Sequence, residues 1–407
     1  MKTIIFLLLI VMVSVMLMGA TAEVTVSIIS PSGDVVEVTP ETTHAYDDET
    51  MQDSAYNAAA AQSITPSALG VGLAGQENSY WVTPMDIRDE AAVWAMLMAP
   101  ITVVDIDQKL QVQLRREPSD DSEAVADVTG TSQGVHVLET LDNGWSLVEV
   151  YSSSFHDSKV KAWNQLTQGY IKTSLLKTRE VGNRQYGMVV DKLTQRLYIF
   201  KEGKLFAELL ISTGLPNERQ PYNETRSGEF LLVSAVGQFR SDNMLSNYAF
   251  RFNFGDLIHE VPHVLNADGG ANYKYTEPKL GERASHGCIR VQRLRNPDGI
   301  NMRWIWNELY KGIAQNPVKF VIWEDVMGRQ IPLPDADTPL YYNANGGQNY
   351  HSAPSCYGVR DEFLPMTQFT YAQLEDSEHK SLTPCPYCAP VRRESEIEAI
   401  NALHRPE

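Results

Sequence analysis

The chain has 407 residues, a formal net charge of −17 at pH 7 and four cysteines. This length exceeds what one ordinary hydrophobic core fills, so we expect several domains. An acidic chain without a basic cluster is a poor candidate for binding nucleic acid or anionic lipid through bulk charge. So few cysteines also exclude a scaffold built on dense disulfides.

The first residues predict export. Lys2 precedes an uncharged apolar run over residues 4–18, and small residues at 20–22 follow at the spacing of a signal-peptidase site. We interpret residues 1–22 as a signal peptide. An uncleaved membrane anchor is the alternative, because the run is near the lower length limit for a spanning helix. In both cases the rest of the chain is expected outside the cytoplasm.

Two segments of different composition follow. Residues 23–78 are rich in Ala, Ser, Thr, Asp and Glu, which is typical of a flexible acidic linker, here with one early strand at 24–29. Residues 79–100 predict a short helical lead-in, in which a helix over 89–98 is ended by Pro100.

Short strands dominate residues 101–178. Apolar and polar residues alternate at 110–114, which predicts a half-buried strand, and Asn143-Gly144 marks a tight turn before the next one. Several short strands within about eighty residues favour a small barrel.

The stretch 109–178 resembles a bacterial SH3-like domain, with residues 152–168 as an insertion. The strings LQVQLRREPSDDSEAV, NGWSLVEV and GYIKTSLL carry this resemblance. It implies a small β-barrel that, in secreted proteins, often binds cell-wall peptides. A spacer that binds nothing is the alternative, because a fold does not determine function.

A second β-rich block spans residues 184–324. Its apolar runs predict strands and one helix, at 188–190, 196–200, 205–211, 230–233, 318–323 and, for the helix, 302–313. The block lacks regular alternation of strands and helices, so a doubly wound parallel sheet is not expected.

The string ASHGCIRV at 284–291 indicates chemistry. Cys288 follows His286 with only Gly287 between them, and a glycine allows backbone and substrate to approach closely. A thiol attacks as a thiolate, so it needs an imidazole or a positive field nearby. His259 could supply the imidazole if the fold brings it to the thiol. A buried, inert cysteine and a core histidine are the alternative, which this specific string disfavours.

The segment from about 185 to 324 resembles the YkuD-type catalytic domain of L,D-transpeptidases. The strings VVDKLTQRLYIFKEGKL, ISTG, TRSGEF, IHEVPH and LGERASHGCIRV carry the resemblance. It implies a mainly β fold, with a YkuD-type β-sandwich catalytic domain that has one or two short helices and follows the SH3-like barrel. It also implies an acyltransferase that needs no cofactor for catalysis.

The resemblance implies roles for several residues. Cys288 matches the nucleophile, and His259 matches the catalytic base and acid, whose imidazole the backbone carbonyl of Glu260 would orient. His286 and Gly287 match positions that shape the pocket and its oxyanion hole.

Ser285 and Arg290 match flanking polar positions, where substrate contact or loop support is expected. The interval between histidine and cysteine is longer than is common, which implies an insertion near residues 265–275, either a lid or a disordered excursion. His263 competes with His259 as the base. We favour His259 because it follows the apolar pair Leu257-Ile258, as a residue at a strand end would.

The resulting hypothesis is a secreted, wall-associated L,D-transpeptidase acting on peptidoglycan stem peptides through a cysteine thioester. An NlpC-type wall peptidase is one alternative, but it would have its cysteine at a helix start with the histidine downstream. A non-catalytic wall-binding protein is another, against which the intact Cys288, His259 and His286 argue.

The C-terminal cysteines predict a small Cys/His domain over residues 338–390, followed by a charged tail at 391–407. His351, Cys356, Cys385 and Cys388 make a three-cysteine, one-histidine set, and this number and spacing of ligands fits structural zinc. The region resembles a small Cys/His knuckle of bacterial secreted proteins. A disulfide such as Cys356–Cys385 with a free thiol left over is the alternative, because export favours oxidation.

Overall fold

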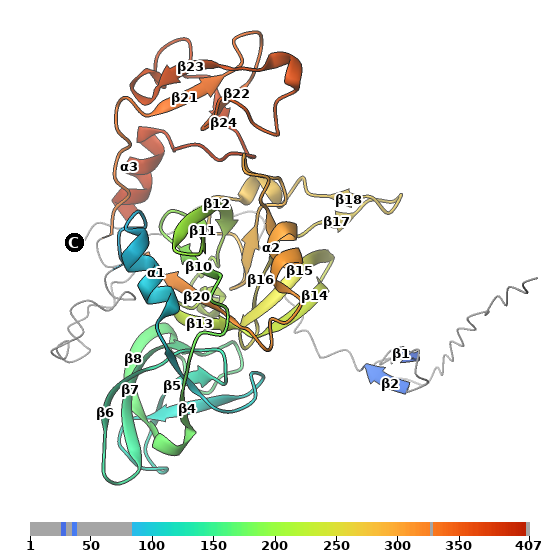
Figure 1. The fold of residues 1–407 in the computed structure, drawn as a ribbon. Coiled ribbons are helices and arrows are strands. Elements are labelled where there is room, and N and C mark those ends of the chain that lie inside the picture. Colours follow the sequence, from blue (N-terminus) through green and yellow to red (C-terminus); the bar gives the residue numbers. More distant parts are fainter. Residues whose placement is uncertain (1–25, 30–34, 39–83, 326–328, 404–407) are drawn as a thin grey trace, which may run out of the picture. The chain divides into compact units, whose positions relative to one another are not determined.

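A computed structural model of the chain describes residues 26–29, 35–38, 84–325 and 329–403 (Figure 1). The chain divides into two units, Met1–Ser54 and Ala55–Glu407. In the first unit, β1 (Val26–Ile29) pairs antiparallel with β2 (Val35–Val38), so the early strand expected at 24–29 is one arm of a hairpin. The predicted signal peptide and most of the predicted acidic linker lie outside the described residues.

The helix expected before the strands is α1 (Glu90–Met98). The side chain of Asp89 accepts a hydrogen bond from the backbone N–H of Ala92 at 3.1 Å, which caps the first turn. At the other end, the buried ammonium of Lys319 donates to the carbonyls of Met96 and Ala99 at 2.9 and 3.1 Å. Within the described residues, no helix has both the length and the apolar character that crossing a membrane requires.

A five-stranded antiparallel sheet follows, in the order β5-β4-β8-β7-β6. Its strands are β4 (Gln111–Arg115), β5 (Ala124–Thr129), β6 (His136–Thr140), β7 (Trp145–Ser153) and β8 (Trp163–Lys172). A separate pair, β3 (Ile101–Val104) with β9 (Leu176–Arg179), lies at the ends of this region. That the sheet is an SH3-like barrel stays a prediction.

The segment 152–168, expected as an insertion, contains the end of β7 and the start of β8. Strand β7 runs to Ser153 and β8 begins at Trp163, and these two residues pair across the ladder. About half of the segment is therefore β-structure, and residues 154–162 connect the two strands. The polar composition of the segment does not predict strands, although one side of a strand tolerates polar residues.

The second β-rich block forms a nine-stranded mixed sheet in the order β13-β20-β10-β11-β12-β19-β16-β15-β14. The strands are β10 (Tyr186–Asp191), β11 (Arg196–Lys201), β12 (Lys204–Ser212), β13 (Gly228–Leu232), β14 (Ser234–Ser241), β15 (Met244–Asn253), β16 (Asp256–Glu260), β19 (Ile289–Val291) and β20 (Val318–Trp323). The pairs β10–β20 and β16–β19 are parallel, and the others are antiparallel.

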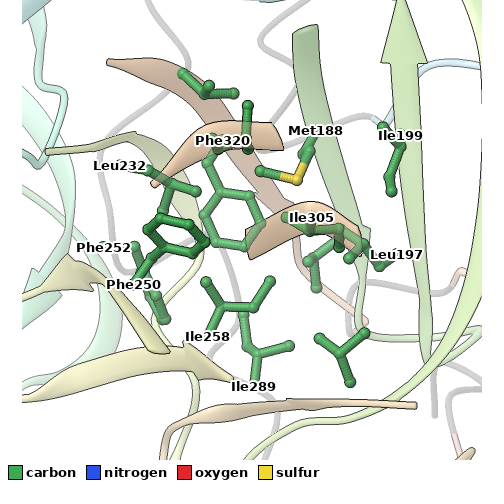
Figure 2. Packing of buried hydrophobic residues seen from close by; sticks show 14 of the residues in the cluster. Met188, Leu197, Ile199, Leu232, Phe250, Phe252, Ile258, Ile289, Ile305 and Phe320 are labelled. Carbon is green, nitrogen blue, oxygen red and sulfur yellow. The ribbon is translucent and has the colours of Figure 1, made fainter. Parts of the chain in front are cut away.

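One core joins the two halves of this sheet. Figure 2 shows Phe320 from one half and Phe252, Ile258 and Ile289 from the other in a single cluster. The Phe252 and Phe320 rings lie 5.4 Å apart between centroids. The halves therefore face each other across shared apolar side chains, as in a β-sandwich. The expected mainly β fold is confirmed.

Helix α2 (Met302–Leu309) packs on this core through Met302, Ile305 and Leu309. It ends before the predicted residue 313, and Gly312, with a φ of +82°, lies in the turn that follows. Between β16 and β19 the chain forms a second hairpin, β17 (Val264–Leu265) with β18 (Ala271–Asn272). The insertion expected near 265–275 is therefore an ordered hairpin.

The C-terminal region contains a four-stranded sheet in the order β23-β21-β22-β24, followed by one helix. The elements are β21 (Pro339–Tyr342), β22 (Asn349–His351), β23 (Thr367–Thr370), β24 (Thr383–Pro384) and α3 (Glu394–Leu403). Short 3-10 turns join the elements of the chain: η3 (Thr173–Leu175), η4 (Pro221–Asn223), η5 (Glu277–Lys279), η6 (Asp361–Phe363) and η7 (Tyr371–Gln373). The predicted tail is helical over most of its described part.

Candidate active site

The parallel pairing of β16 with β19 brings the upstream histidine to the cysteine motif. Ile258 lies opposite Ile289, and His259 lies opposite Arg290. Because successive side chains of a strand point to opposite faces, the two isoleucines enter the core while His259 and Arg290 lie on the other face. Cys288 is two residues before Arg290 and shares this face.

The His259 imidazole is held in one tautomer. Its Nδ1–H donates to the backbone carbonyl of Glu260 at 2.7 Å, so that Nε2 is left as the proton acceptor. The Phe239 ring meets the imidazole edge to face, 5.1 Å between centroids. Burial, with the nearby charge of Arg290, lowers the pKa of His259 to about 4. At neutral pH this imidazole is an uncharged base.

Cys288 is half-buried, and its thiol is also uncharged at neutral pH. Burial, followed by the negative charge of Asp256, raises the pKa of the Cys288 thiol to about 11, although an N–H from Leu257 acts in the opposite direction. The hydrogen bonds among described residues include none between the Cys288 thiol and the His259 imidazole. The resting pair is therefore a neutral thiol and a neutral imidazole on one face of the sheet.

Gly287 lies next to the buried ion pair of Arg226 and Asp256. Its φ is +117°, and a Cβ at this position would lie 2.5 Å from Oδ1 of Asp256. That carboxylate pairs with Arg226 at 3.2 Å, and both side chains are buried. The Gly287 carbonyl accepts a hydrogen bond from the Thr225 hydroxyl at 2.8 Å. The requirement for glycine is thus both conformational and steric.

Ser285 supports the loop that carries the cysteine. Its hydroxyl donates to the Cys288 carbonyl, and its backbone N–H donates to the carbonyl of Thr213 at 3.0 Å. These contacts favour loop support over substrate contact for Ser285. His286 is exposed beside the cysteine, and Arg290 is half-buried opposite Ser212.

His263 is placed differently from His259. It lies beyond the end of β16, pairs through its backbone with Leu245 on β15, and faces the Tyr273 ring at 5.0 Å. Its Nδ1 is buried without a hydrogen-bond partner among the described residues. The residue has no pairing with β19, which makes His259 the better candidate for a base.

Sequence reasoning missed the support beneath the motif. The Arg226 guanidinium lies 4.0 Å from the Phe155 ring centroid and donates to the carbonyl of Ser154, both in the loop after β7. The backbone N–H of Ser227 donates to Asn164 of β8 at 2.7 Å. The small sheet thus contacts the nucleophile loop through Arg226. The one signal in the sequence was Arg226-Ser227 itself, where the resembling family commonly has a proline.

The C-terminal cysteines and histidine come together as predicted. Four donor atoms, one each from His351, Cys356, Cys385 and Cys388, all lie within 4.8 Å of one another. Sγ of Cys356 and Sγ of Cys385 are 3.8 Å apart, and Sγ of Cys388 is 3.6 Å from Nδ1 of His351. All four cysteines of the chain are free. A disulfide would need a sulfur–sulfur distance near 2.0 Å.

One segment of the chain matches a known family. Residues 185–319 match the family model of the YkuD L,D-transpeptidase catalytic domain, and this range includes Cys288 and His259. The chain therefore contains an L,D-transpeptidase catalytic domain. No curated protein matches the chain.

Several solved structures are similar in part. An L,D-transpeptidase from Xylanimonas cellulosilytica is 18% identical with a TM-score of 0.22, over 36% of this chain and 64% of that one. One from Stackebrandtia nassauensis is 17% identical with a TM-score of 0.23, over 35% and 56%. One from Mycobacterium smegmatis is 14% identical with a TM-score of 0.25, over 56% and 92%. The chain thus spans less than two thirds of the first two proteins.

We predict that Gly287→Ala disrupts the nucleophile loop, because the new methyl group would overlap the Asp256 carboxylate. Gly346→Ala is the matched control, since Gly346 has a similar φ of +111° but nothing within 4 Å of the added Cβ. Both variants bear the backbone cost of about 1 kcal/mol. Only Gly287→Ala should lower the free energy of unfolding by a further ~2 kcal/mol or more. Equal losses in denaturant titrations would contradict the steric account.

Proposed function

We propose that the chain is a secreted cysteine L,D-transpeptidase that acts on peptidoglycan stem peptides. The observation that supports this proposal is the register of β16 with β19, which pairs His259 with Arg290, two residues after Cys288, within the segment that matches the catalytic domain. Peptidoglycan lies outside the cytoplasm, which agrees with the export signal expected at residues 1–22.

In the first half of the reaction, Cys288 attacks the carbonyl carbon after the third residue of a stem peptide. Nε2 of His259 takes the thiol proton as the bond between sulfur and carbon forms. Because the thiol has a pKa near 11 and the imidazole one near 4, a free ion pair is unfavourable, and proton transfer has to accompany attack. Backbone N–H groups near Gly287 would stabilise the oxyanion.

In the second half, the bond to the terminal D-amino acid breaks, and His259 returns the proton to the leaving amine. The acyl group is then held as a thioester on Cys288. An amine from a neighbouring stem attacks this thioester and forms the new amide, and the proton it loses returns to the thiol through His259. This step needs no metal or organic cofactor.

The alternative enzyme class agrees less well with the geometry. An NlpC-type peptidase would have its cysteine at the start of a helix and its histidine downstream, whereas Cys288 directly precedes strand β19 and His259 lies upstream on β16. Wall association through the five-stranded sheet is proposed from its resemblance to SH3-like domains. Contacts from Phe155 to Arg226 and from Asn164 to Ser227 support a structural role for this region as well.

We predict that Cys288→Ala abolishes both release of D-alanine and formation of stem-peptide dimers, measured by mass spectrometry. His259→Ala should lower kcat by 10²-fold or more, because general-base assistance is lost. His263→Ala is the matched control, since this histidine is also buried but is not paired with β19; its kcat should fall less than about tenfold. Dimer formation by Cys288→Ala would refute the assignment.

We also propose that His351, Cys356, Cys385 and Cys388 hold one zinc ion. Zn–S bonds near 2.3 Å and Zn–N bonds near 2.0 Å make a tetrahedron with S–S edges of about 3.8 Å and S–N edges of about 3.6 Å. Two of the separations in the structure, 3.8 and 3.6 Å, are close to these edges, and all four donor atoms lie within 4.8 Å of one another. Four protein donors leave no position for substrate, which favours a structural role.

We expect the purified full chain to contain about one zinc per molecule by elemental mass spectrometry. Cys385→Ser should lose the metal and lower the midpoint of thermal unfolding. Cys288→Ser is the control, because it removes a thiol outside the cluster and should leave the zinc content unchanged. Equal metal content in all three proteins would rule out zinc at this cluster.

A further inference from the structure

A cavity of about 950 Å³ lies in the second unit and shares no lining residue with the candidate catalytic residues. Its walls come from three parts of the second unit. Arg196 and Arg293 belong to the catalytic sheet or follow it, Lys274 follows the β17–β18 hairpin, and Pro386 and Arg392 belong to the C-terminal segment. The hairpin that lengthens the interval between His259 and Cys288 is therefore one wall of this cavity.

The cavity opens on the face of the sheet that carries the candidate catalytic residues. Arg196 pairs with Leu210, two residues before Ser212, and Ser212 pairs with Arg290. Partners in a ladder and residues two apart on a strand share a face, so Arg196 and Leu210 lie on the side of Arg290 and Cys288. The intervening residues point into the core on the opposite side.

The turn that carries two of the cysteines is bonded to this face. The carbonyl of Tyr387, between Cys385 and Cys388, accepts a hydrogen bond from Gln292 at 3.3 Å. The carbonyl of Ala389 accepts one from Arg196 at 3.1 Å. The Cys/His cluster thus fixes the C-terminal wall of the cavity against the catalytic sheet.

The cavity lining has more cationic than anionic side chains. Four cations line it, and two of them have carboxylate partners: Arg196 pairs with Glu208 at 2.8 Å and Arg293 with Glu277 at 2.9 Å. Arg392 and Lys274 form no ion pair within the described part of the chain.

The two other carboxylates of the lining, Glu396 and Glu282, lie near Arg392 but form no ion pair with it within the described residues. Glu396 accepts the backbone N–H of Arg393 at 3.1 Å, and Glu282 lies 3.9 Å from the ammonium of Lys279. Among the described residues, Arg392 donates to backbone carbonyls alone, those of Gly281 at 2.6 Å and Thr194 at 3.4 Å. Burial and the nearby charge of Arg196 lower the pKa of Arg392, while the nearby Glu396 and Glu282 act in the opposite direction.

We propose that this cavity is a subsite for a peptide carboxylate, with Arg392 and Lys274 as the groups that bind it. The prolines and leucines of the lining suit the apolar parts of a short peptide. The inference rests on the proposed function in one respect: the peptide is taken to be a stem peptide, whose free carboxylates would reach this cavity while another part lies at Cys288. Guanidinium groups are well suited to such recognition because they bind carboxylates through paired hydrogen bonds.

The test measures binding rather than turnover. Full-length protein with Cys288→Ala is titrated calorimetrically with a stem peptide bearing free carboxylates and with the same peptide amidated at those groups. The free peptide should bind about tenfold more tightly than the amidated one. Adding Arg392→Gln should weaken binding of the free peptide about tenfold and leave the amidated peptide unchanged.

A second pair of variants keeps the test decisive if Arg392→Gln alters the C-terminal wall. Lys274 and Lys311 each lie 5.6 Å from the ring centroid of a neighbouring tyrosine, but only Lys274 lines the cavity. Lys274→Gln should weaken binding of the free peptide about twofold to threefold, and Lys311→Gln should have no effect. Equal binding of both peptides, or equal effects of both lysine variants, would overturn the subsite.

The outcome separates this inference from the proposed reaction. Carboxylate-dependent binding that is lost in the Arg392 and Lys274 variants supports the subsite even if the wild-type protein releases no D-alanine. Turnover of stem peptides with binding that is indifferent to amidation supports the reaction and overturns the subsite.

Discussion

The parallel pairing of β16 with β19 is the contact on which the account of this protein depends. It places His259 opposite Arg290 and therefore on the same face as Cys288, although 29 positions separate the two candidate catalytic residues in the sequence. The same ladder sends Ile258 and Ile289 into the core, so that the fold and the site are stabilised by one set of contacts. A slip of one residue would invert both faces and bury the imidazole in the core.

The candidate site is supported by buried charged side chains that take no part in the proposed reaction. Arg226 and Asp256 pair beneath Gly287, and breaking such a pair leaves one charge unpartnered at a cost of about 3–5 kcal/mol. The ion pair shapes the loop, and the charge of Asp256 also helps to keep the Cys288 thiol protonated. Because the Phe155 ring contacts Arg226, the region of the small sheet helps to support the loop that carries Cys288.

Much of this arrangement could be predicted from the sequence. The motif around Cys288, the strands that flank it and the four residues of the Cys/His cluster follow from local patterns and ligand spacing. The β17–β18 hairpin, the pairing of Ser153 with Trp163 and the ion pair under Gly287 could not, because they depend on contacts between distant segments. The cavity also depends on how the C-terminal segment meets the sheet, which no local pattern encodes.

The most direct test of the central claim is the pH dependence of Cys288 alkylation in the free protein, followed by mass spectrometry of the peptide that contains it. A neutral thiol beside a neutral imidazole predicts a rate that rises about tenfold per pH unit from pH 7 to 10, since only the thiolate reacts. A plateau between pH 5 and 8 would show a preformed thiolate–imidazolium pair and would contradict the account.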